Sequence, residues 1–128
     1  MKDAYTNWRE IADGNLTATE TSAAIELGPA PMGGHPVAIH IPEQNAAGDT
    51  LDITFTQSAT SGGSYATFHT IAQITGASAA PTRKAVLLNN TLPFVKCVLT
   101  VGGATPDWGD VSVGVDVGYR ANVLTVGD

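Results

Sequence analysis

The segment Val111-Ser112-Val113-Gly114-Val115-Asp116-Val117-Gly118 decides how the rest of the chain is interpreted. Valine alternates there with a small or polar residue through four repeats. Because successive side chains of a β-strand point to opposite faces, one face of this segment is a valine stripe and the other has almost no bulk. Such a strand is typical of a two-layer β protein with a dry interior, and its bare face does not suit a catalytic floor.

Several other short segments also have strand character and are separated by turn residues. We expect strands at Ser22–Leu27, Pro36–Ile41, Thr50–Gln57, Tyr65–Ile74, Lys84–Leu88, Phe94–Val101 and Val111–Tyr119. Phe68 and Ile71 fall out of phase, which predicts a bulge in the fourth of these strands. About eight short strands without a long helical period indicate an all-β sandwich or barrel. We expect antiparallel pairing, because no connection is long enough to hold a crossover helix.

A sandwich is favoured over a barrel because the expected inward side chains are large enough to fill the space between two sheets about 10 Å apart. These inward positions are Val37, Ile39, Leu51, Ile53, Phe55, Leu87, Val95, Leu99, Val113 and Val115. The residues leave a jelly roll and an immunoglobulin-like sandwich open. The Cys…Trp…Cys pattern of true immunoglobulin domains is missing.

The two ends of the chain are expected to extend beyond a sandwich domain that spans residues 21–119. Residues 1–20 form an N-terminal arm, with a short helix over Asp3–Ile11 that ends at Asp13-Gly14-Asn15. The arm is too poor in apolar residues to form its own core, so its aromatics must pack on the domain or on a partner. Residues 120–128 form a C-terminal extension, either an edge strand or a segment that reaches a neighbour.

Composition excludes several classes of function. The 128 residues carry a formal net charge of −6, with only six Lys and Arg residues, which is too few for nucleic acid or an anionic membrane surface. No apolar run approaches a membrane span, and the N-terminus lacks a signal-peptide core, so secretion by the general route is not expected. The single cysteine, Cys97, is expected to be a buried small hydrophobe on the same face as Val95 and Leu99.

No catalytic or metal-binding pattern stands out, and we expect neither an enzyme nor a cofactor. The chain lacks a Gly-x-Ser-x-Gly turn, a phosphate loop and an Asp-x-Asp-x-Asp-Gly calcium loop. His35 and His40 are five residues apart and should point to opposite faces, which is poor spacing for one metal ion. His40 and His69 are expected to face outward from their strands, with His35 in a loop.

Interface residues are more plausible than catalytic ones. Trp108 lies in a Pro-Asp-Trp-Gly turn and either packs against a sheet end or anchors a protein interface, where tryptophan is enriched. The same alternatives apply to Trp8 and Tyr119. The full set of candidate interface residues is Tyr5, Trp8, Trp108, Tyr119, Arg120, Val123 and Leu124.

Several short segments, in order along most of the chain, share a pattern with a known family. They are Lys2–Tyr5, Leu16–Thr19, Ile25–Gly28, Leu51–Ser58, and Val98-Leu99-Thr100-Val101-Gly102-Gly103-Ala104-Thr105 followed by Gly109-Asp110-Val111-Ser112-Val113-Gly114-Val115. The first three resemble the start, the fourth a strand and the last the end of the jelly-roll cement, or decoration, proteins of tailed bacteriophage capsids. The loop Thr105–Trp108 is not part of the resemblance.

The resemblance implies a jelly-roll sandwich and a structural virion protein without catalytic residues. Such a protein would be made in the host bacterial cytoplasm and would bind the major capsid protein on the outer surface of an icosahedral head. It would bridge capsomers and would associate with itself as a dimer or trimer. Contacts through terminal arms would involve 1–19 and 119–128.

Two other functions remain open from the residues. A carbohydrate-binding or adhesive sandwich, of tail-fibre or cell-surface type, would need exposed aromatics, and Trp8 and Trp108 are the candidates. A small cupin-like enzyme would need clustered His and Glu ligands.

Overall fold

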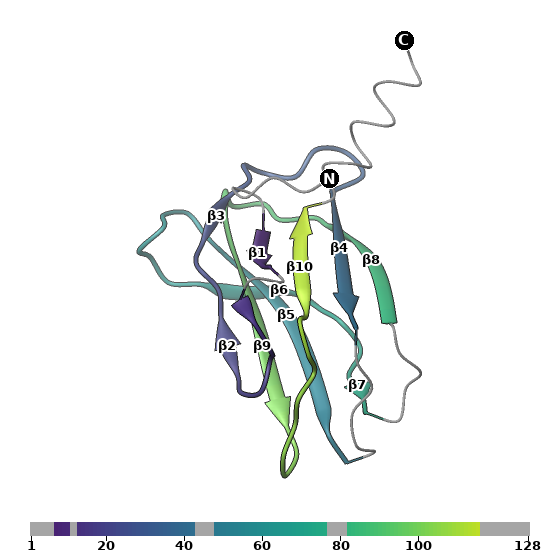
Figure 1. The fold of residues 1–128 in the computed structure, drawn as a ribbon. Helices are drawn as coiled ribbons and strands as arrows, with labels where there is room; N and C mark the ends of the chain where they lie inside the picture. The colour runs from purple at the N-terminus through teal and green to yellow at the C-terminus, as the bar shows by residue number, and fades with distance from the viewer. Residues whose placement is uncertain (1–6, 11–12, 43–47, 77–81, 116–128) are drawn as a thin grey trace.

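The protein is all-β in a computed structural model that describes residues 7–10, 13–42, 48–76 and 82–115 (Figure 1). Ten strands lie in these ranges: β1 (Asn7–Arg9), β2 (Glu20–Thr21), β3 (Ile25–Glu26), β4 (His35–Ile41), β5 (Thr50–Ser58), β6 (Ala66–Thr70), β7 (Ile74–Thr75), β8 (Thr82–Leu88), β9 (Phe94–Gly102) and β10 (Ser112–Val115). No α-helix occurs in the described ranges, and therefore none that could cross a membrane.

The strands form two antiparallel sheets. The four-stranded sheet has the order β1-β10-β4-β8. The six-stranded sheet has the order β2-β9-β5-β6, with β3 also paired to β9 and β7 also paired to β5. Strands that follow one another along the chain often lie in different sheets, as β4 and β5 do. The expected two-sheet antiparallel architecture is therefore confirmed.

The hydrophobic core lies between the sheets and follows the predicted alternation. Burial alternates residue by residue along β4 and along most of β5 and β9, because each strand has one face toward the opposite sheet. Nine of the ten expected inward positions are buried, namely Val37, Ile39, Leu51, Ile53, Phe55, Val95, Leu99, Val113 and Val115.

Leu87 is the exception, and the prediction that it points inward is wrong. Its side chain is 55% exposed, whereas Leu88 is fully buried and Val86 packs against the core. The pairing of β8 with β4 sets this phase, because Val86 lies opposite the inward Val37. Three consecutive apolar residues, Val86-Leu87-Leu88, allow either phase in the sequence, and a slip of one residue exchanges the two faces.

The predicted bulge is present where β5 meets β6. Phe55 pairs with His69 and the next residue, Thr56, pairs with Thr67, so Phe68 is the extra residue. The pairing also breaks after Thr70 and resumes at β7. His69 consequently lies opposite the inward Phe55, with ring centroids 6.2 Å apart, and the expectation that it faces outward is wrong.

The expected helix at the N-terminus is also wrong for the residues that are described. Asn7–Arg9 form strand β1, which pairs with β10 at the edge of the four-stranded sheet. The bare face of β10 is likewise not solvated in its described part, because Ser112 is 5% exposed and Gly114 is buried. β10 is a central strand, and neighbouring strands flank these small residues on both sides.

Candidate functional site

Trp8 is an internal link between the sheets. It is 7% exposed, and its ring meets that of Phe55 edge-on with centroids 5.3 Å apart. Its indole Nε1 donates a hydrogen bond of 2.9 Å to the backbone oxygen of Val95. Trp8 therefore connects an edge strand of one sheet to β5 and β9 of the other. This segment packs on the β domain, and Trp8 is not an exposed anchor as an interface residue would be.

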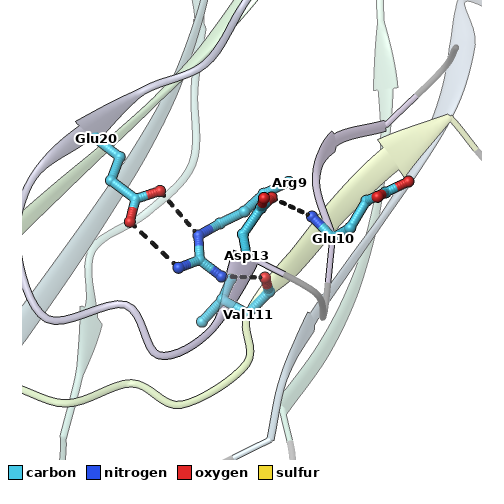
Figure 2. A network of polar contacts seen from close by, with 5 residues as sticks. All are labelled: Arg9, Glu10, Asp13, Glu20 and Val111. Carbon is cyan, nitrogen blue, oxygen red and sulfur yellow. Dashed lines mark hydrogen bonds and ion pairs between the residues drawn. The ribbon is translucent and has the colours of Figure 1, made fainter. Parts of the chain in front are cut away.

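Arg9 is buried beside Trp8 and forms an ion pair across the edge of the sandwich (Figure 2). Its Nε and Nη2 donate to the two carboxylate oxygens of Glu20 at 3.0 and 3.2 Å, and its Nη1 donates to the backbone oxygen of Val111 at 2.8 Å. The fork of a guanidinium matches a carboxylate in this two-bond geometry. Because β1 and β2 belong to different sheets, the pair fastens the two sheets together. After β1, the Oδ2 of Asp13 accepts a hydrogen bond from the Glu10 N–H at 2.8 Å.

No local pattern marks Arg9 as buried. A register shift between Asn7 and Arg9 interrupts the alternation of β1, and both Trp8 and Arg9 are buried as a result. The partner of Arg9 is eleven residues away on another strand. The sequence therefore contains no signal that distinguishes Arg9 from the other five Lys and Arg residues.

Trp108 closes the same edge. It is 2% exposed. Its backbone N–H donates to the backbone oxygen of Leu16 at 2.9 Å, and the backbone N–H of Leu16 donates to the backbone oxygen of Gly109 at 2.9 Å. Asp107 holds the turn by accepting from the Gly109 N–H at 3.0 Å. Of the two alternatives for Trp108, burial of the side chain supports packing on the sandwich. Leu16, in the connection from β1 to β2, is fully buried like Trp108, and we call these two residues with Trp8, Arg9 and Glu20 the N-terminal edge.

The other candidate interface residues, Tyr5, Tyr119, Arg120, Val123 and Leu124, lie outside the described residues.

The histidines do not come together. His35 is the first residue of β4 and pairs with Leu88, so the expectation that it lies in a loop is wrong. It faces inward with Nε2 3.3 Å from the Gly28 oxygen, and His40 points to the opposite face, as its spacing predicts. Within the described ranges, no three His, Cys, Asp or Glu side chains are grouped closely enough to hold a metal ion.

Cys97 is a core residue, as expected. It is fully buried on the inward face of β9. Burial raises the pKa of the thiol from 9.0 to about 12, because the apolar surroundings disfavour the thiolate. A nucleophilic cysteine needs an accessible thiolate, so Cys97 is chemically inert in the folded protein.

The exposed apolar surface of the described residues gathers at the end of the sandwich that carries the β3–β4 and β8–β9 connections (Figure 1). Met32 is fully exposed, Leu87 is 55% exposed and Leu92 is 37% exposed. These are the exposed large hydrophobic side chains of the described part of the chain. We call residues 28–34, Leu87 and residues 89–93 the apolar end.

Sequence patterns did not single out the apolar end. Its two halves are far apart along the chain and are joined by a hydrogen bond of 2.8 Å from the Ala30 N–H to the Asn90 oxygen. A signal is nevertheless present in the composition. Residues 27–42 and 85–95 contain no Asp, Glu, Lys or Arg.

Acidic residues occupy the connections that start from the opposite end of the sandwich (Figure 1). Residues 48–52 and 103–106, which we call the acidic end, carry Asp49 and Asp52 and no Lys or Arg. Asp107 and Asp110 follow on the connection that leads from this end to the N-terminal edge. Asp49 is 3% exposed, and Asp52 accepts from the Gln73 side-chain amide at 3.0 Å. Arg83 and Lys84 at the start of β8 also lie toward this end, because they pair with His40 and Ile39 near the end of β4. This end therefore carries charges of both signs, whereas the residues of the apolar end carry none.

No model of a known protein family matches this chain, and the search of curated proteins found no significant similarity. A fold alone does not specify a function. The inference about function therefore depends on the residues and their arrangement.

Proposed function

We propose that the protein is a structural virion protein, a capsid cement protein of a tailed bacteriophage. It would bind the major capsid protein on the outer surface of an icosahedral head, bridge capsomers and associate with itself as a dimer or trimer. It would be made in the host bacterial cytoplasm. Neither catalysis, a cofactor, nucleic acid nor a membrane has a part in this function.

The strand order of the two sheets is the observation that carries the proposal. When β2 and β3 count as one interrupted strand, and β6 and β7 as another, the sheets have the orders 1-8-3-6 and 2-7-4-5 in units of eight strands. We propose that this strand order is a jelly roll, a double-sheet architecture of eight strands common in viral capsid domains. Lectins and cupins also use it, so the strand order supports the proposal without specifying the function.

Three of the segments that resemble the cement proteins lie on central strands. Leu51–Ser58 is nearly all of β5, and Val98–Thr105 includes the end of β9. Gly109–Val115 leads into and forms β10. β5, β9 and β10 each have a neighbour on both sides. The resemblance therefore concerns the framework of the sandwich, in the order that the family has along its chain.

The mechanism would be mass action. A protein that binds the assembled shell more tightly than free subunits stabilises the shell by RT ln(1 + [L]/Kd) per site. The charged content of 14% suits this role, because few charges must lose water when a surface is covered. The acidic balance favours a capsid surface with exposed Lys or Arg.

The structure weakens the carbohydrate-binding alternative. That function requires exposed aromatic rings, and both tryptophans of the chain are in the core. No observation on the described residues favours it, and replacement of Trp108 would test folding and not glycan recognition.

Binding to shells tests the proposal. Heads assembled from the virus's own capsid protein without this chain are mixed with purified protein and sedimented, then heated until they rupture. We expect saturable co-sedimentation at a fixed ratio to the capsid subunit and a higher rupture temperature. Heads of an unrelated phage serve as the control. Failure to bind, or binding without protection, would refute the proposal.

A further inference from the structure

We propose that the apolar end is the surface through which two copies of this chain pair head to head about a twofold axis. The proposal rests on the self-association part of the proposed function, and it names the surface and the orientation. The second copy contacts Met32, Leu87 and Leu92 of the first with its own same residues.

The first observation is the clustering of exposed apolar side chains on a surface without charge. Met32, Leu87 and Leu92 come from three separate places in the sequence, yet they lie on two adjoining connections and the strand end between them. Pro29, Pro31 and Pro93 add apolar surface. Exposed apolar side chains that gather on adjoining segments mark a contact site in soluble proteins more often than scattered single residues do.

The second observation is that internal bonds hold both loops. The Asn90 side-chain amide donates to the oxygens of Gly28 and Leu92 at 2.9 and 2.8 Å. The Gln57 side-chain oxygen accepts from the N–H groups of Thr91 and Leu92 at 2.8 and 3.1 Å. A surface already fixed in shape loses little conformational entropy on binding.

Gly34 brings the first loop against the end of β8. Its φ of +83° is in the left-handed region, and a Cβ at this position would lie 2.9 Å from the Leu88 oxygen and 3.2 Å from the Leu87 Cβ. Only glycine fits this approach without displacement. The close approach places the Met32 loop beside Leu87 and makes one surface of the two.

Charge placement indicates a second copy as the occupant. A twofold contact sets each residue near its own counterpart, so a charged patch would meet its own sign. The residues of the apolar end carry no charge to repel a copy, although the exposed Glu26 precedes them on β3 and the chain as a whole carries −6. The strand β5 has nine residues and so spans about 30 Å. Head-to-head pairing would place the two acidic ends about 60 Å apart, several times the Debye length at physiological salt.

Sedimentation velocity over a range of protein concentrations is the first test. We expect a monomer–dimer equilibrium that the double variant Met32→Asp/Leu92→Asp weakens at least tenfold. The matched control, Ala104→Asp/Thr105→Asp, adds the same two charges at exposed positions of the acidic end and should leave the equilibrium unchanged. Circular dichroism confirms that both variants fold. A chain that is monomeric throughout, or a dimer that the apolar-end variant does not weaken, would overturn the proposal.

Distances between spin labels test the orientation. Cys97 is buried and stays unlabelled, so a label on Met32→Cys or Thr105→Cys reports one site in each copy. We expect a short distance between the Met32→Cys labels and about 60 Å or more between the Thr105→Cys labels. The reverse order would refute head-to-head pairing.

The two proposals fail separately. If a monomeric chain binds and protects heads, the pairing surface is wrong and the cement function stands. If the chain pairs through the apolar end and never binds heads, the pairing surface stands and the cement function is wrong. If the Met32→Asp/Leu92→Asp variant remains dimeric but loses head binding, the apolar end contacts the capsid protein, and the pairing proposal is overturned.

Discussion

The N-terminal edge and the apolar end use hydrophobic residues in opposite ways. At the edge, two tryptophans and a leucine are buried between the sheets, and a buried Arg9 joins β1 to Glu20 on the other sheet. At the apolar end, Met32, Leu87 and Leu92 remain exposed, although they are smaller than tryptophan. The comparison teaches that residue type alone does not identify an interface. The aromatics that seemed suited to a partner hold the chain's own strand in place.

The largest expected effect is at the edge. Trp8→Ala removes a fully packed ring and its hydrogen bond to Val95, and should lower the free energy of unfolding by about 3–5 kcal/mol. Urea denaturation followed by circular dichroism measures it. Trp8→Phe keeps most of the packing and should cost less. A loss below about 1 kcal/mol for Trp8→Ala would mean that β1 contributes little, and the contrast between the two regions would fail.

A backbone change at the apolar end comes next. Gly34→Ala should cost about 1–3 kcal/mol, because its Cβ would press on the Leu88 oxygen in a strained backbone conformation. Gly28→Ala is the matched control, since Gly28 also has a positive φ, +73°, but no atom within 4 Å of the added Cβ. Thermal unfolding of both variants separates the contact from the backbone strain. Equal losses would show that the close approach to β8 is unimportant.

The ion pair of the edge is expected to have a smaller effect. Glu20→Gln leaves the charge of Arg9 buried without its full partner, which costs 3–5 kcal/mol when both groups are buried. The Glu20 side chain is 42% exposed, so water can replace part of the contact and we expect about 1–2 kcal/mol. Glu26→Gln on the neighbouring β3 is the control, because Glu26 is exposed. If the two substitutions lower the free energy of unfolding equally in urea titrations, the ion pair between Arg9 and Glu20 does not contribute to stability.

Cys97 reports on the core that both regions enclose. Its folded pKa is raised to about 12 from 9.0, so the thiol's contribution to stability is full below pH 9 and is lost as pH rises toward 12. We expect the stability difference between the natural chain and Cys97→Ala to change over this window and to be constant below it. Urea titrations at several pH values measure it. A constant difference from pH 7 to 11 would contradict the burial of the thiol.

The smallest expected effect on stability is at the exposed side chains. Met32→Asp should change the free energy of unfolding by less than about 0.5 kcal/mol, because the side chain is fully exposed in the single chain. Thermal unfolding at low protein concentration measures it. A loss comparable with that of Trp8→Ala would show that Met32 packs within its own chain, and the apolar end would lose its role as a free surface.

Much of the framework could be predicted from local alternation, and the connections between distant residues could not. Ile39, Ile53 and Leu99 sit in strands whose polar and apolar residues alternate, so the inward face is set residue by residue. Leu87 lies in an apolar run without such a phase, and its pairing with β4 decides its direction. The bulge at Phe68 was visible because the alternation itself breaks there.

The candidate site was harder to predict because it depends on contacts between segments far apart in the chain. Trp8 bonds to Val95 and Leu16 to Gly109, and nothing local distinguishes these residues from an exposed arm. The apolar end forms because two uncharged segments, within residues 27–42 and 85–95, lie next to each other in the fold. Their lack of charge is compatible with this contact but does not predict it.

The pairing of β1 with β10 has a consequence for how the protein is made. The first described strand finds its place only beside the last one, so synthesis must pass Val115 before the four-stranded sheet can close. Until then Trp8 and Arg9 lack the strand that positions them, and β4 lacks its neighbour β10. Pairing between strands so far apart in the sequence slows folding, because the entropy of closing the loop is lost before the stabilising contacts form. The nascent chain would therefore complete its sandwich late, after the ribosome has released β10.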